Sequence, residues 1–165
     1  MSAPSQASTA DRYRAHVAAV WAGQPADGAH DLGHLQRVWT NARAIALDEP
    51  EVDWQVLEAA VWFHDLVNLP KSAPNRAEAS RLSAQAATDF LADIGFPAGK
   101  RPAVAHAIEA HSFSAGIAPL TIEARILQDA DRIEALGAIG LARCLAVSGA
   151  LGRALFDPED PMALN

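Results

Sequence analysis

The sequence predicts an all-α, single-domain protein, a bundle of about six or seven helices. Apolar residues recur at helical spacing through most of the chain. No stretch alternates apolar and polar residues for long enough to predict a strand. The length of 165 residues suits one domain, and an apolar content of 50% is sufficient for a packed core.

The first elements follow from apolar spacing and from chain breaks. Residues 1–10 are small and polar and are expected to be a disordered lead-in, so the domain is expected over 11–165. A second helix is expected over 31–48, with Asp31 as its N-cap. In chain order, helices are expected over 11–21, over 31–48, and from about 52 into the 60s, the last apolar enough to be buried.

The later elements are separated by proline and glycine. Residues 68–76 contain two prolines without helical spacing and are expected to be a loop. Pro119 is expected in the first turn of a sixth helix, and Gly137 and Gly140 separate this helix from the last one. Helices are expected over 77–94 and over 102–111. A further helix begins at about 119, the last helix ends at about 149, and a turn follows near 156–161.

The charge and the cysteine content narrow the range of functions. A net charge of −7 argues against nucleic-acid binding, although a bound cation would still allow a nucleotide substrate. Cys144 is the single cysteine and has apolar neighbours, which predict a buried helix position and no disulfide. The N-terminus lacks a signal pattern and no apolar stretch could cross a bilayer, so we expect a cytoplasmic protein without a membrane partner.

Three separated stretches, 30–38, 59–66 and 126–134, combine metal-ligand residue types with apolar helices. The second is the most informative, because His64 and Asp65 directly follow a strongly apolar helix. An ionised aspartate is costly to bury without a partner, and a metal ion is a natural one. The alternative for an isolated pair is a capping aspartate beside a hydrogen-bonded histidine.

Together the three stretches resemble the HD superfamily of metal-dependent phosphohydrolases. The matching residues are His34, the pair His64-Asp65, and Asp131 before Arg132, and the resemblance spans about residues 30–160. It is strongest to a bacterial subgroup of single-domain HD hydrolases, through the stretches 111–124 and 128–132. It implies an HD-type helical bundle that hydrolyses a phosphoester or phosphoanhydride, in a nucleotide or a similar small molecule.

The resemblance also implies the ligand set. His34, His64, Asp65 and Asp131 would hold one divalent ion, and His64, Asp65 and Asp131 are the expected catalytic residues. Two imidazoles and two carboxylates suit Mn²⁺, Mg²⁺, Co²⁺ or Fe²⁺. Asp131 is preferred to Asp129 because the family's ligand precedes a basic residue; Asp129 could instead orient another ligand.

Four further residues are expected to bind substrate phosphate. Lys71 and Arg76 follow the His64-Asp65 pair, with solvated loop positions as the alternative. His111 ends a helix and opens the family-like stretch. Arg37 lies three residues after His34 and either reaches the same site or pairs with an acid. Of the other histidines, His30 is expected in a loop and His106 in a structural role.

Some positions depart from the family pattern. Asn68 stands where some HD nucleotidases carry a catalytic glutamate, and Glu134 stands where relatives often carry aspartate. Relatives continue with a further helical segment, so the pocket is expected either to lack that segment or to be closed by a partner, such as a second copy in a homodimer. The alternative functions are a non-catalytic nucleotide-binding regulatory module and an HD-type di-iron oxygenase.

Overall fold

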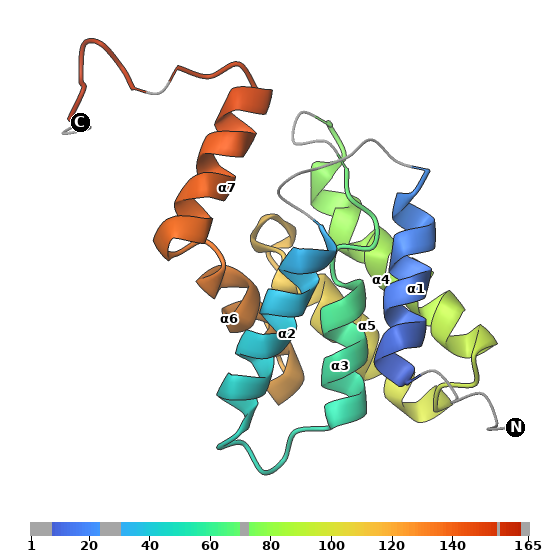
Figure 1. Ribbon diagram of the computed structural model, residues 1–165. Coiled ribbons are helices and arrows are strands. Elements are labelled where there is room, and N and C mark those ends of the chain that lie inside the picture. Colours follow the sequence, from blue (N-terminus) through green and yellow to red (C-terminus); the bar gives the residue numbers. More distant parts are fainter. Residues whose placement is uncertain (1–7, 24–30, 70–72, 155, 163–165) are drawn as a thin grey trace, which may run out of the picture.

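The computed structural model describes residues 8–23, 31–69, 73–154 and 156–162. These ranges form seven α-helices and three short 3₁₀ helices, with no strand among them, which confirms the predicted all-α fold (Figure 1). The α-helices are α1 (Thr9–Trp21), α2 (Leu32–Ala46), α3 (Trp54–Phe63), α4 (Ala79–Asp93), α5 (Arg101–His111), α6 (Ile122–Ile133) and α7 (Gly137–Ala150).

Side-chain caps decide where several helices begin. Asp31 caps α2 as predicted, and its Oδ1 accepts a hydrogen bond from the His34 N–H at 2.7 Å. Ser8 forms a capping box with Asp11, so α1 begins inside the segment predicted to be disordered; residues 1–7 lie outside the described ranges. Thr121 caps α6, so the prediction that Pro119 lies in the first turn of that helix is wrong.

The core is centred on α3, which packs against α1, α2, α5 and α6. As predicted, α3 is a buried helix, and Leu57 and Phe63 are fully enclosed. The Phe63 ring meets the Tyr13 ring edge-on, with 4.9 Å between their centroids. Burying each such side chain stabilises the folded state by roughly 2 kcal/mol. This packing fixes the end of α3 that carries His64.

Helix α7 has a different environment and extends away from the bundle formed by α1 to α6 (Figure 1). Gly140 makes its sharp departure from α6 possible, because a Cβ there would meet the Ala135 carbonyl at 2.2 Å. Leu141 and Leu145 are exposed. Cys144 is exposed too, so its predicted burial is wrong: its apolar neighbours face solvent instead of a core.

Within the described residues, no single helix is long and apolar enough to cross a membrane. Of the helix pairs in the described ranges, only α6 with α7 reaches that length and composition, and the two are bent by 76° at the break between them. Beyond α7 the chain turns, with a bridge between Asp157 and Asp160, which confirms the predicted turn.

Candidate metal centre

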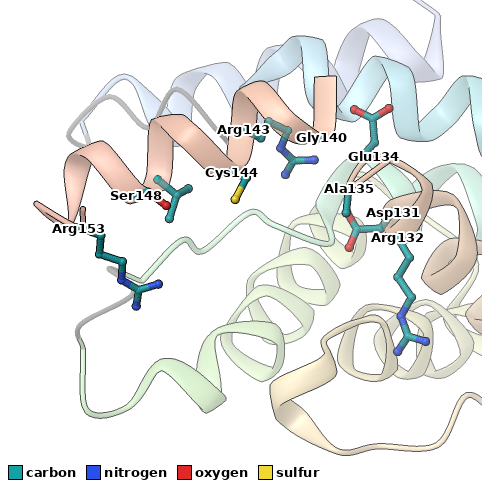
Figure 2. Close-up of a pocket in the computed structure, with 10 residues that line it drawn as sticks. Asp131, Arg132, Glu134, Ala135, Gly140, Arg143, Cys144, Ser148 and Arg153 are labelled. Atoms are coloured by element: carbon teal, nitrogen blue, oxygen red, sulfur yellow. The ribbon is translucent and has the colours of Figure 1, made fainter. Parts of the chain in front are cut away.

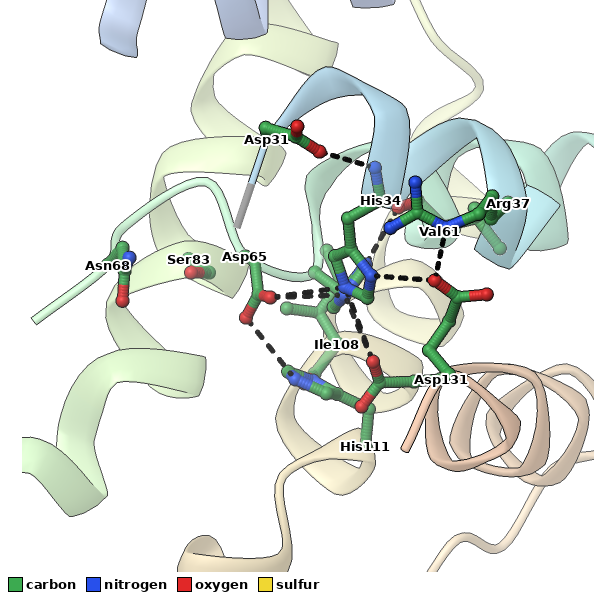
Figure 3. Close-up of polar contacts among 12 residues, drawn as sticks. Asp31, His34, Arg37, Val61, Asp65, Asn68, Ser83, Ile108, His111 and Asp131 are labelled. Carbon is green, nitrogen blue, oxygen red and sulfur yellow. Dashed lines mark hydrogen bonds and ion pairs between the residues drawn. The ribbon is translucent and has the colours of Figure 1, made fainter. Parts of the chain in front are cut away.

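Four helices bring one cluster of histidines and aspartates together (Figure 3). His34 lies in the first turn of α2, and His64 caps the C-terminal end of α3, with Asp65 directly after it. His111 is the last residue of α5, and Asp131 lies in the last turn of α6. The three separated motifs of the sequence therefore meet at one end of the bundle.

The four candidate ligands face one another at short range. Nε2 of His34 lies 3.4 Å from Oδ1 of Asp131 and 3.7 Å from Oδ2 of Asp65. Nε2 of His64 lies 3.3 Å from the same Asp65 oxygen and 3.9 Å from the same Asp131 oxygen. Donor atoms that share an ion at about 2.0–2.3 Å are roughly 3–4 Å apart. These atoms are therefore spaced to hold one metal ion.

The ring orientation of two histidines is set by their own helices. Nδ1 of His64 lies 2.8 Å from the Val61 carbonyl oxygen, and Nδ1 of His111 lies 2.6 Å from that of Ile108. Because a carbonyl only accepts, each Nδ1 carries a proton and donates it, which leaves Nε2 as the ring nitrogen that faces the cluster. Nε2 of His64 is buried and has no hydrogen-bond partner among the described residues, as expected of a metal ligand.

The histidines and aspartates of the cluster shift one another's pKa values in opposite directions. Burial lowers the pKa of His34, but hydrogen bonds to Asp131 and Asp65 outweigh it and raise the pKa to about 9. Burial raises the pKa of Asp65, yet the charge of His64 and hydrogen bonds from His111 and His34 hold it well below its usual value. The aspartates are therefore ionised and pair with protonated imidazoles, whose positive charge a metal ion would replace.

His111 adjoins the cluster through the second oxygen of Asp65. Its Nε2 lies 3.6 Å from Asp65 Oδ1, whereas Oδ2 of Asp65 faces His34 and His64. Ligand atoms of His64, Asp65 and His111 lie within 4.8 Å of one another, so they form a second group able to hold a metal. The geometry is compatible both with the predicted phosphate contact and with a ligand role for His111.

Glu134 is a buried residue whose role the sequence analysis missed. Its Oε2 accepts a hydrogen bond from Arg37 Nε at 2.6 Å and lies 3.6 Å from Nδ1 of His34. Asn41 donates to the other oxygen at 3.4 Å. Arg37 thus makes the acid pairing that the sequence left open. Glu134 lies three residues after Asp131 on α6, a spacing that places both on one helix face and could have indicated its role.

The remaining sequence candidates lie elsewhere. Lys71 and His30 fall outside the described residues. Arg76 donates within its own loop, to Asn68 Oδ1 at 3.1 Å and to the Leu69 carbonyl. Asp129 is exposed, whereas Asp131 faces the cluster. His106 accepts a hydrogen bond from the Leu120 N–H at 2.9 Å, in line with a structural role.

A comparison with protein families matches the HD domain over residues 31–136, a range that holds all four candidate ligands. The chain belongs to the HD domain family. Proteins of this family are typically metal-dependent phosphohydrolases. Family membership therefore agrees with a cluster of histidines and aspartates whose donor atoms are spaced for a metal ion.

Relatives in three bacteria share this fold. Bacillus subtilis YpgQ is 33% identical over 134 residues, and the match spans 79% of this chain but only 62% of that protein. The crystal structure of YpgQ with ADP superposes with a TM-score of 0.67, at 30% identity over 92% of this chain and 73% of that one. The structure of a Lactobacillus plantarum protein superposes with a TM-score of 0.69 at 31% identity, over 92% of this chain and 69% of that one. The structure of Listeria innocua Lin1889 superposes with a TM-score of 0.64 at 25% identity, over 92% of this chain and 72% of that one.

Proposed function

We propose that this HD domain is a metal-dependent phosphohydrolase that cleaves a phosphoester or phosphoanhydride in a nucleotide or a similar small molecule. The observation that carries the proposal is the spacing of His34, His64, Asp65 and Asp131, whose paired donor atoms lie 3.3–3.9 Å apart. A binding module without turnover would not need four buried or half-buried groups arranged around one point.

These four residues would hold one divalent cation, such as Mn²⁺, Mg²⁺, Co²⁺ or Fe²⁺. When bound, the cation supplies an acidified water and neutralises charge on the phosphoryl group. Glu134 holds the His34 ring in place through its approach to Nδ1, and the carbonyls of Val61 and Ile108 do the same for His64 and His111.

Proton transfer needs a group other than residue 68. Asn68 cannot accept a proton, so the general-base role that some HD nucleotidases give to a glutamate at that position is lost. His111 has its Nδ1–H committed to the Ile108 carbonyl, so Nε2, which lies 3.6 Å from Asp65 Oδ1, is the ring atom through which a proton can be exchanged at the site. We therefore assign His111 either the transfer of a proton or contact with the substrate phosphate.

A small phosphorylated molecule is the proposed substrate. The crystallised complex of YpgQ with ADP supports a nucleotide-like ligand. A net charge of −7 is unfavourable for nucleic acid but compatible with a nucleotide held by a cation.

The test is to load the protein with each of the four metals and to screen nucleotides and phosphomonoesters, detecting both phosphate and pyrophosphate. We expect metal-dependent release from at least one compound and its loss on chelation. Metal analysis should find one exchangeable divalent ion per chain, whereas two irons per chain would favour an oxygenase. A metal-loaded protein that binds nucleotides without releasing any product would identify a regulatory module.

A further inference from the structure

A cavity of about 500 Å³ opens beside the candidate metal centre, between the end of α6 and helix α7 (Figure 2). Asp131 and Glu134 of α6 lie on one side of it, and Arg143, Cys144 and Ser148 of α7 lie on the other. The volume is in the range of small-molecule pockets and exceeds what a single phosphate group fills. The cavity therefore has room for the part of a substrate that extends beyond the metal.

One face of α7 lines this cavity. Gly140, Arg143, Cys144 and Val147 follow one another at intervals of three, one and three residues, which places them on the same side of a helix. Leu141, between them in sequence, is exposed. The close passage of Gly140 against Ala135 fixes how α7 departs from α6, and so it fixes where Arg143 is presented.

Arg143 differs from the other cations considered at this site. Arg37 is paired with Glu134, and Arg76 is held by its own loop. Arg143 is half-buried and forms no ion pair with any carboxylate in the described part of the chain.

We infer that Arg143 binds a second phosphoryl group of the substrate, in the cavity between α6 and α7, and that the protein therefore prefers a diphosphate-type substrate to a phosphomonoester. Arg132 and Arg153 also line the cavity but are exposed, whereas the half-buried guanidinium of Arg143 faces the end of α6 and attracts a phosphoryl group there. A guanidinium pairs with two phosphate oxygens at once, which adds geometric selectivity to the charge. This inference rests on the proposed function.

The single cysteine provides a reporter of cavity occupancy that needs no turnover. Cys144 is exposed and lies next to Arg143 on the cavity side of α7. With Mn²⁺ present, inorganic pyrophosphate should slow the reaction of Cys144 with a thiol reagent more than orthophosphate does. Arg143→Ala should abolish this protection, and Arg143→Lys should retain part of it. Arg14→Ala removes one exposed charge from α1, outside the cavity lining, and should leave protection unchanged.

Kinetics supply the second readout. For ADP, Arg143→Ala should raise KM roughly ten- to a hundredfold, and for p-nitrophenyl phosphate the change should be less than about threefold. Equal protection in wild type and Arg143→Ala, or equal loss with both substrates, would overturn the inference. If no compound is hydrolysed but protection by pyrophosphate still depends on Arg143, the proposed function fails and the anion site stands. Circular dichroism of each variant confirms the fold.

Discussion

The two sides of the cavity differ in how they are held. The four candidate ligands come from α2, the end of α3 and α6, which pack against one another, and His34 and His64 are fully buried. Helix α7 contributes Arg143 from a segment whose other faces are exposed. From this difference we propose that the bundle holds the metal-binding residues rigidly, whereas α7 binds the part of the substrate that extends beyond them.

The largest effect is expected from Asp65→Ala. Asp65 is the one carboxylate that approaches all three histidines of the cluster, so its removal should abolish metal-dependent turnover, by at least about a thousandfold, with the fold preserved. Metal content, circular dichroism and phosphate release are measured on one preparation. Asp129→Ala removes an exposed carboxylate from α6 and serves as the matched control. Full activity in a folded, metal-poor Asp65→Ala protein would rule out the mechanism.

The second expectation concerns pH and the metal-free protein. The pKa of His34 is raised from 6.5 to about 9, so the stabilisation from its protonated form is complete below pH 6.5 and is lost as the pH rises through about 9. The free energy of unfolding should fall over this window by up to roughly 3 kcal/mol. Metal affinity should rise over the same window, since His34 must lose its proton to bind. Denaturant titrations at several pH values, with and without Mn²⁺, measure the fall in unfolding free energy and the rise in metal affinity. In the metal-free protein, His34→Gln should make the unfolding free energy less dependent on pH over this window.

Glu134→Gln is expected to have an intermediate effect. The carboxylate lies 3.6 Å from His34 Nδ1 and anchors Arg37, so replacing it should weaken metal affinity roughly ten- to a hundredfold. Arg37→Ala should change metal affinity by less, because it removes only the outer partner. Isothermal titration with Mn²⁺ measures both. A raised KM for Arg37→Ala with unchanged metal affinity would restore the role in substrate binding predicted for it from the sequence.

His111→Ala separates the two roles that the geometry allows. If His111 contacts phosphate, the variant should weaken substrate use by roughly ten- to a hundredfold and keep its metal affinity. The same pattern is expected for Lys71→Ala, which tests the loop after the His64-Asp65 pair. Metal titration alongside steady-state kinetics measures both variants. Loss of metal from His111→Ala would instead make it a ligand and overturn the assignment of a single four-residue metal site.

The smallest effect is expected on α7. Leu141→Ala should change the free energy of unfolding by less than about 0.5 kcal/mol, because Leu141 is 60% exposed. The reference is Leu127→Ala on α6, a fully buried position where the cost should be about 2–5 kcal/mol. Urea denaturation compares the two. A large cost at Leu141 would show that another surface covers α7 in solution.

The same contrast explains what the sequence could predict. Asp31 correctly predicted the start of α2, and the continuous apolar run of α3 correctly predicted a buried helix. Both signals are local in the sequence. The family predicted from His34, His64-Asp65 and Asp131 is confirmed for the same reason: each motif lies on a helix or directly after one, so its position follows from local sequence.

The errors arise where tertiary context decides. Cys144 was expected to be buried because its neighbours are apolar, yet α7 leaves the bundle and those neighbours are exposed. The error at Pro119 has a local cause instead: it was expected in the first turn of α6, but Thr121 caps the helix and Pro119 lies two residues before that cap. Arg143 carries no sequence signal, because only the bend after α6 brings it to the cavity.

The ends of three helices have a consequence for the order of events. His64 caps α3, His111 is the last residue of α5, and Asp131 lies in the last turn of α6. Carbonyl groups at a helix C-terminus carry about half a negative charge, and three such ends outweigh the single positive N-terminus of α2, so the backbone here favours cations over phosphate. We therefore expect a compulsory sequence of binding in which the cation enters first and the phosphorylated molecule follows.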